Sequence, residues 1–146
     1  MVSLSKQAVE GKALIAGDLT MTGQQLLDAM EFSVALLPDE SGAFLQVSGM
    51  RYDVDVSIPT PAALDDHHLC SYVKNETRRI SNLQILNPAT GVYDDIKPEK
   101  TYTVASIDYL LTEMGGSGIL RHAKYDGRYW GTELEVLADF FKTTRP

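Results

Sequence analysis

Five side chains that can bind a metal ion lie close together in the middle of the chain. They are Asp65, Asp66, His67, His68 and Cys70. Zinc sites usually separate their ligands by two to four residues, so that the side chains converge on one ion. Adjacent residues point apart instead, so this spacing favours a solvated acidic loop over a metal site.

A second pattern that could bind a ligand is the glycine cluster Gly115, Gly116 and Gly118. A phosphate cradle needs glycines between a strand and the N-terminus of a helix, where free N–H groups converge. These glycines follow a short helix predicted from Asp108 to Met114, and the chain has no Gly-Lys-Ser/Thr tripeptide. The pattern therefore indicates a tight exit from a helix, with Gly115 as its C-cap.

No pattern in the chain marks a catalytic nucleophile or base. The sequence has no Gly-x-Ser-x-Gly elbow, and Cys70, its only cysteine, has no neighbouring signature. His122 lies near Arg121 and Lys124 and is predicted to be a surface residue. The chain alone is therefore expected to be non-catalytic and to hold no metal or cofactor.

Length and charge set further bounds. A chain of 146 residues matches one domain, which buries about 68–70% of its unfolded surface. The formal net charge of −7 argues against nucleic acid as a partner, because phosphate backbones are bound by clustered Lys and Arg. No apolar run approaches the roughly 18 residues that a membrane span requires.

The first elements that could position such residues are a strand and a helix. Residues from Leu14 to Met21 alternate with period two and predict a strand. Thr22 and Gln25 form a capping box, which predicts a helix that continues to about Leu36. The apolar face of this helix consists of Leu26, Leu27, Met30 and Val34.

Further along, period-two runs and turn residues predict a set of strands. These are Phe44–Ser48, Met50–Ser57, Arg79–Leu86 and Thr101–Ile107, with a turn or bulge at Gly49 and a turn at Asn87–Gly91. The segment from Ile58 to Thr77 has two prolines and no stable period, which indicates a long surface excursion.

A second capping box, Thr132 with Glu135, predicts the last helix. Its apolar residues follow at helical spacing and are Leu134, Leu137, Ala138 and Phe141. Strands and helices together predict an α/β or α+β single domain, in which a mixed β-sheet is covered by helices.

The order of these elements resembles one known family. An amphipathic helix precedes the Phe-Leu-Gln-x-Ser-Gly strand at Phe44, and a Tyr-x-Val-Ala strand at Tyr102 precedes a helix ending in Gly-Gly-x-Gly. This order is similar to the C-terminal domain of the 5′-nucleotidases and UDP-sugar hydrolases. The resemblance runs from roughly Lys12 to Lys142. Residues 1–11 are therefore expected to be a linker or the start of a fragment, and residues 12–146 the substrate-binding domain.

The resemblance also implies a substrate site. In the family, an aromatic ring at the position of Phe44 forms one side of a clamp on the base, and an aromatic in a Gly-Gly-Asp-Gly-aromatic loop forms the other. In this chain Ser117 replaces the acid and Ile119 replaces the ring. The family's Asn-Gly-Gly-x-x-Arg segment, whose Arg binds substrate, has no counterpart. The implied substrate-binding residues are Phe44, Gly116, Ser117, Gly118 and Ile119.

Two alternatives remain open at this site. Phe44 is equally consistent with a core position on a strand, because Phe is often buried. The missing ring could come from Tyr125, Tyr129 or Trp130 in the neighbouring loop, although packing under the last helix is the favoured role for these side chains.

The resemblance implies the substrate-binding domain of a 5′-nucleotidase-type phosphohydrolase that acts on nucleotides or nucleotide sugars. In that family a separate preceding domain binds two divalent metal ions, which polarise the phosphate and generate hydroxide. The expected partners are a nucleotide or nucleoside and a metallophosphatase domain or subunit. By the same resemblance, the whole protein would be periplasmic, secreted or at the cell surface.

Two other functions remain open. Ser117 and Ile119 favour an interaction module that has lost ligand binding and docks to a separately encoded metallophosphatase subunit. A free-standing binder of small molecules is the third possibility. A metallophosphatase domain upstream in the same reading frame would support the substrate-binding domain over the docking module.

Overall fold

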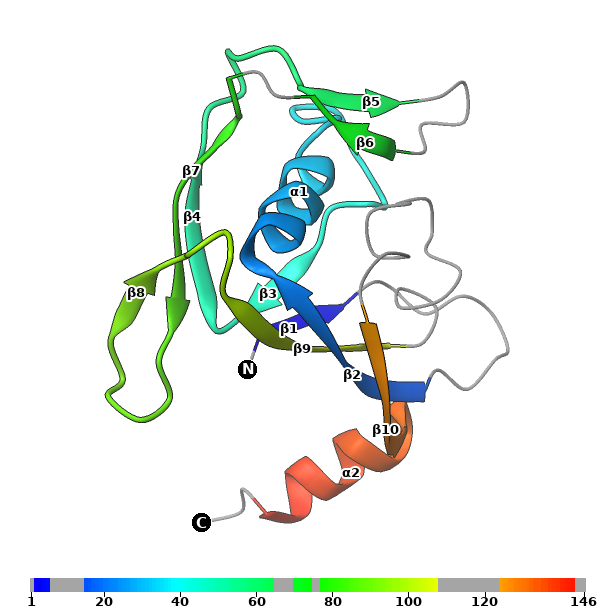
Figure 1. The fold of residues 1–146 in the computed structure, drawn as a ribbon. Helices are drawn as coiled ribbons and strands as arrows, with labels where there is room; N and C mark the ends of the chain where they lie inside the picture. The colour runs from blue at the N-terminus through cyan, green and yellow to red at the C-terminus, as the bar shows by residue number, and fades with distance from the viewer. Residues whose placement is uncertain (1, 6–14, 65–69, 75–76, 108–123, 144–146) are drawn as a thin grey trace.

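The computed structural model describes residues 2–5, 15–64, 70–74, 77–107 and 124–143 (Figure 1). The helices are α1 (Gly23–Ser33) and α2 (Glu133–Thr143). The strands are β1 (Val2–Ser5), β2 (Ile15–Thr22), β3 (Gln46–Ser48), β4 (Met50–Val54), β5 (Ala62–Leu64), β6 (Cys70–Val73), β7 (Ile80–Leu86), β8 (Tyr93–Asp95), β9 (Thr101–Ile107) and β10 (Lys124–Thr132).

The strands form two sheets and a separate hairpin. A five-stranded sheet has the order β10-β2-β9-β1-β3, a three-stranded sheet has the order β4-β7-β8, and β5 pairs with β6. The larger sheet is mixed, since β1 runs parallel to β9 whereas β2 runs antiparallel to it. These elements confirm the predicted mixed α/β fold.

Helix α1 is the centre of the molecule, with β4 and β7 along one side of it and the β5–β6 hairpin beside its far end (Figure 1). The predicted capping box starts it, because the Thr22 N–H donates to Gln25 Oε1 at 2.8 Å and the Gln25 N–H donates to Thr22 Oγ1 at 3.2 Å. The helix ends at Ser33, a little before the predicted end near Leu36.

The core gathers around α1 and β2. Leu26, Met30 and Val34 are fully buried, and Leu19 and Met21 meet them from β2. Burial of each such side chain contributes about 1.5–3 kcal/mol, so this row fixes α1 on the large sheet. The remaining core side chains come mainly from β7 and β9 and include Ile80, Leu83, Ile85, Val104 and Ile107.

Two buried charged residues join α1 to β7. The Glu31 carboxylate, which is fully buried, accepts the backbone N–H groups of Arg79 at 2.8 Å and Ile80 at 3.1 Å. The Arg79 guanidinium donates to four carbonyl oxygens. Three lie just beyond α1, at Val34, Ala35 and Leu37, and the fourth is that of Ile58 in the loop after β4. Arg79 therefore joins β7 to the segment that follows α1 and to the loop after β4.

The structure corrects two predictions about the middle of the chain. The strand predicted over Met50–Ser57 ends at Val54, because the Asp55 carboxylate accepts the N–H and hydroxyl of Ser57 and turns the chain. The segment from Ile58 to Thr77 is not a plain surface excursion, since it contains the β5–β6 hairpin.

Other differences concern strands that the sequence pattern did not reveal. Residues Val2–Ser5, within the segment expected to be a linker or fragment start, form β1 in the large sheet. Strands β8 and β10 were not predicted either. The turn at Asn87–Gly91 is confirmed, with the Gly91 N–H donating to the Asn87 carbonyl at 2.8 Å and a φ of 70° at Gly91.

Helix α2 forms as predicted but does not bury its apolar stripe. The capping box is present, since the Thr132 N–H donates to Glu135 Oε2 at 2.8 Å and the Glu135 N–H donates to Thr132 Oγ1 at 3.3 Å. Leu134 is nevertheless 75% exposed, Leu137 50% and Phe141 59%. Helix α2 follows β10 and extends away from the sheets along most of its length (Figure 1). Helix α1 covers the sheet as expected, whereas the apolar stripe of α2 stays exposed.

Candidate functional site

Phe44 is the described half of the predicted base clamp. Its side chain is half-buried and packs against the core, so part of the ring remains accessible. Phe44 lies just ahead of β3 rather than on a strand, and its part in a clamp stays a prediction. Residues Gly116, Ser117, Gly118 and Ile119 lie outside the described residues, as do the helix predicted at Asp108–Met114 and its C-cap Gly115.

The backbone around Phe44 is held by hydrogen bonds to both sides. The Leu45 N–H donates to the buried Ser33 Oγ at 2.7 Å, which ties the segment to the end of α1. The Ala43 N–H donates to Ser41 Oγ at 3.1 Å, and the Phe44 N–H donates to the Ser41 carbonyl at 3.2 Å. Such anchoring positions a ring for stacking at low cost in conformational entropy.

Most of the other candidate residues lie outside the described part of the chain. Asp65, Asp66, His67, His68 and His122 lie outside the described residues, and Cys70 is the first residue of β6. Within the ranges that the structure describes, no group of three His, Cys, Asp or Glu side chains could hold a metal ion.

The aromatic residues expected in a neighbouring loop lie on a strand instead. Tyr125, Tyr129 and Trp130 are part of β10, which pairs with β2 at the edge of the large sheet. Tyr125 lies opposite Leu19, and Tyr129 lies opposite Gly17. The loop assignment for these residues is therefore wrong.

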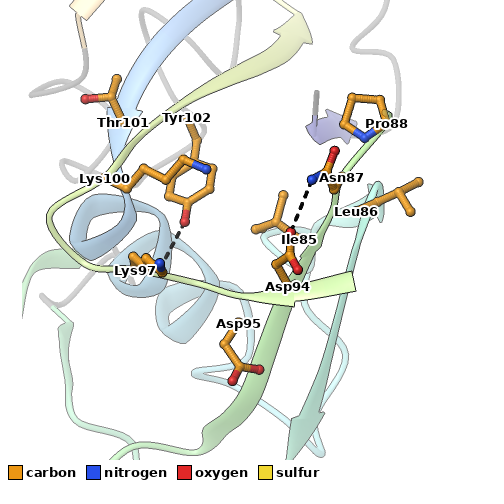
Figure 2. Close-up of a pocket in the computed structure, with 10 residues that line it drawn as sticks. All are labelled: Ile85, Leu86, Asn87, Pro88, Asp94, Asp95, Lys97, Lys100, Thr101 and Tyr102. Carbon is orange, nitrogen blue, oxygen red and sulfur yellow. Dashed lines mark hydrogen bonds between the residues drawn. The ribbon is translucent and has the colours of Figure 1, made fainter. Parts of the chain in front are cut away.

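Sequence reasoning missed a groove between the β7–β8 hairpin and the start of β9 (Figure 2). Its volume is about 580 Å³, and its lining residues are Ile85, Leu86, Asn87, Pro88, Asp94, Asp95, Lys97, Lys100, Thr101 and Tyr102. The lining includes two lysines and the carboxylate of Asp94, although β8 is too short and polar to be found from its sequence pattern. The turn at Asn87–Gly91 was the available signal.

Comparison with families of known proteins matches the model described as "5'-nucleotidase, C-terminal domain" over residues 16–123. The match includes α1, Phe44, β9 and residues Gly115 to Ile119. The chain belongs to the 5′-nucleotidase C-terminal domain family. The predicted resemblance is thereby confirmed.

Solved structures share the fold of this 5′-nucleotidase C-terminal domain. A 5′-nucleotidase precursor from Thermus thermophilus is 21% identical with a TM-score of 0.69, covering 97% of this chain and 28% of that chain. A Haemophilus influenzae NAD nucleotidase is 18% identical with a TM-score of 0.61, covering 98% and 26%. The Thermus thermophilus sulfate thiohydrolase SoxB is 18% identical with a TM-score of 0.60, covering 99% and 27%.

This chain thus spans between a quarter and three tenths of the length of these solved relatives. The names of these relatives give different activities, so the shared fold does not define one substrate. A comparison with curated protein sequences found no match. None of the helices in the described ranges is long and apolar enough to cross a membrane.

Proposed function

We propose that this chain is the substrate-binding domain of a 5′-nucleotidase-type phosphohydrolase that acts on nucleotides or nucleotide sugars. The observation that carries the proposal is the family match over residues 16–123, which spans the expected clamp. The whole protein would then be periplasmic, secreted or at the cell surface.

Catalysis belongs to a separate domain in this proposal. Divalent ions would be needed for phosphoester cleavage, yet the described residues include no metal-ligand cluster and the sequence has no nucleophile signature. In this proposal, the task of the chain is to bind and orient the substrate for a metallophosphatase domain or subunit.

The proposed binding residues are Phe44 and the loop Gly116, Ser117, Gly118 and Ile119. The partly exposed Phe44 could stack on any base, and stacking contributes about 1–3 kcal/mol. Ile119 offers an apolar surface without a π face, and Ser117 offers a hydroxyl in place of a carboxylate. Nucleosides should therefore bind weakly, with a Kd no tighter than about millimolar.

The first test is turnover by the chain alone. With Mn²⁺, Zn²⁺ or Mg²⁺ added, we expect no release of phosphate from AMP or from an aryl phosphate, because no described cluster binds the ion. Turnover that a chelator abolishes would contradict the proposal that catalysis belongs to a separate domain.

The second test addresses the clamp. Titration with adenosine or uridine should shift the NMR signals of Phe44 and of residues 116–119. Replacement Ile119→Phe should strengthen binding by about 1 kcal/mol by adding a second stacking face. If the signals of Phe44 and of residues 116–119 do not shift while those of another surface do, the clamp has been lost.

The exposed stripe of α2 favours a second candidate, a docking module. Large exposed apolar patches mark interaction sites, and Leu134, Leu137 and Phe141 form such a stripe on one helix. At helical spacing, Glu135 and Lys142 lie on the side of α2 next to this stripe and Asp139 lies on the far side, so the charges near the stripe have both signs. The proposed occupant is a metallophosphatase domain, in the same reading frame or encoded separately.

Calorimetry with the metallophosphatase domain or subunit encoded beside this chain can test the docking module. The double change Leu137→Ser and Phe141→Ser should weaken the complex at least tenfold. Val92→Ser is the matched control, since Val92 is also apolar and 56% exposed but lies beside β8. Equal binding by both variants would rule out α2 as the docking surface.

A further inference from the structure

The groove between the β7–β8 hairpin and the start of β9 shares no residue with the predicted base clamp. Its volume of about 580 Å³ lies within the range of small-molecule sites, roughly 300–1,000 Å³. Lys97 and Lys100 line one wall, and Asp94 lies on the wall formed by the hairpin (Figure 2). A site here would be distinct from the one proposed above.

The lysine wall is fixed to the N-terminus of α1. The Gly23 N–H donates to the Lys100 carbonyl at 2.8 Å, and the Gln24 N–H donates to the Pro98 carbonyl at 2.8 Å. A Cβ at Gly23 would collide with the carbonyl of Lys97, so only glycine permits this close approach. The turn that carries Lys97 and Lys100 is therefore preformed.

Among the described residues, the ammonium groups on this wall have no carboxylate partner. Lys100 Nζ lies 5.3 Å from the ring centroid of Tyr102, a cation–π distance. The Tyr102 hydroxyl accepts the backbone N–H of Lys97 at 2.9 Å, which sets the position of the ring. In the described part of the chain, the one ion pair is Arg78 with Asp28, so Lys97 and Lys100 remain available to an anionic group.

The hairpin wall is acidic above an apolar floor. Asn87 Nδ2 approaches Asp94 Oδ2 at 3.4 Å, a long hydrogen bond that leaves the carboxylate able to accept another donor. Asp95 is already bound by Gln84 Nε2 at 2.7 Å and lies apart from the other side chains in Figure 2. Ile85 is 8% exposed and supplies the apolar floor.

We propose that this groove binds a small zwitterionic molecule, with an anionic group at Lys97 and Lys100, an amine at Asp94 and an apolar body over Ile85. Opposite charges line one preformed hollow without pairing across it, so a ligand with both charges can satisfy each wall. An anion alone would leave Asp94 with only its long hydrogen bond from Asn87 and would feel its repulsion. A cation alone would face the same penalty at the lysines.

Three related probes test this charge pattern, namely 4-(aminomethyl)benzoate, benzoate and benzylamine. We expect the zwitterion to shift the NMR signals of Asn87, Asp94, Lys100 and Tyr102 and to bind about threefold more tightly than either single-charge probe. Binding should weaken as salt is raised. Equal binding of all three probes, or no shift at these residues, would overturn the proposal.

Charge-removing variants locate the two ends of the ligand. The double change Lys97→Gln and Lys100→Gln should weaken the zwitterion about threefold or more, and Asp94→Asn should do so to a smaller extent. Lys74→Gln is the matched control, because Lys74 is also exposed but does not line the groove. If the control weakens binding as much as the groove variants, the lysines act only through net charge and the site is rejected. Because the clamp residues are untouched, this result stands apart from the nucleoside titration.

Discussion

At the scale of single residues, Arg78 and Arg79 show how burial decides the role of a charge. Arg78 forms an ion pair with Asp28 at 2.5 Å, and both side chains are 25% exposed. Arg79 is only 8% exposed and donates to four backbone carbonyls. Partly exposed ion pairs contribute little to the free energy of unfolding. A buried guanidinium contributes more when it donates to carbonyl oxygens that would otherwise be buried without a hydrogen bond.

Replacement of the two arginines should therefore have unequal effects. Arg79→Met leaves buried carbonyls unsatisfied and is expected to lower the free energy of unfolding by about 2–4 kcal/mol. Arg78→Met, the matched control next to it, should lower it by less than about 1 kcal/mol. Chemical denaturation of both variants measures the difference, and equal losses would contradict this account.

Gly23 offers a second prediction at this scale. Gly23→Ala places a methyl group against the backbone at Lys97 and should destabilise the fold by about 1–3 kcal/mol. Gln24→Ala in the same turn is the control, because the Gln24 side chain is exposed and its loss should cost under about 0.5 kcal/mol. Thermal unfolding of the pair would test the close approach, and a neutral Gly23→Ala would disprove it.

At the scale of elements, the two helices begin with the same capping device but pack differently. Leu26 of α1 is fully buried, whereas Leu137 of α2 is 50% exposed. Leu26→Ala should cost about 2–5 kcal/mol in the free energy of unfolding, because it opens a cavity in the core. Leu137→Ala should stay within about 1 kcal/mol, as measured by denaturation. A large loss for Leu137→Ala would mean that the stripe is buried in the isolated chain.

The capping boxes also differ in their response to pH. The backbone N–H and then the hydroxyl of Thr132 lower the pKa of Glu135 below its usual value of 4.5, so the carboxylate strengthens the cap above that pH. This contribution is lost as pH falls through the lowered pKa of the folded helix. Amide exchange at the start of α2 should therefore quicken at acid pH.

Helix α1 supplies the internal control for this pH effect, because Gln25 takes the corresponding position and does not titrate. The start of α1 should show no matching change. The variant Glu135→Gln should abolish the acid step in α2, and persistence of the step would assign it to another group.

At the scale of the whole molecule, local signals in the sequence predicted the local structure. The capping boxes at Thr22 and Thr132 predicted the starts of α1 and α2, and alternation predicted β2. A run closed by turn residues predicted β7, and an apolar run predicted β9. These signals depend on residues within a few positions of one another. The resemblance supplied the family and the candidate ring at Phe44, which the family match covers.

Long-range pairing could not be predicted in the same way. Strands β1, β8 and β10 are short, glycine-containing or rich in polar residues, and their partners rather than their own patterns make them strands. The groove at Lys97 arises only when the hairpin meets the turn before β9. The exposure of Leu134 and Phe141 was not predicted, because an apolar stripe shows which face of a helix is hydrophobic without showing what packs against it.

The position of β1 has a consequence for the order of folding. In the described residues, β1 is the strand that joins β3 to the large sheet, with Val2 opposite Val104 and Ser3 opposite Ser48. Contacts between such distant parts of a chain close late, because loop-closure entropy opposes them until other contacts form. Strand β3, with Phe44 just ahead of it, should thus gain amide protection in the same slow kinetic step as β1. A synthetic peptide with the sequence of residues 1–5 should restore that protection to a chain from which those residues have been removed.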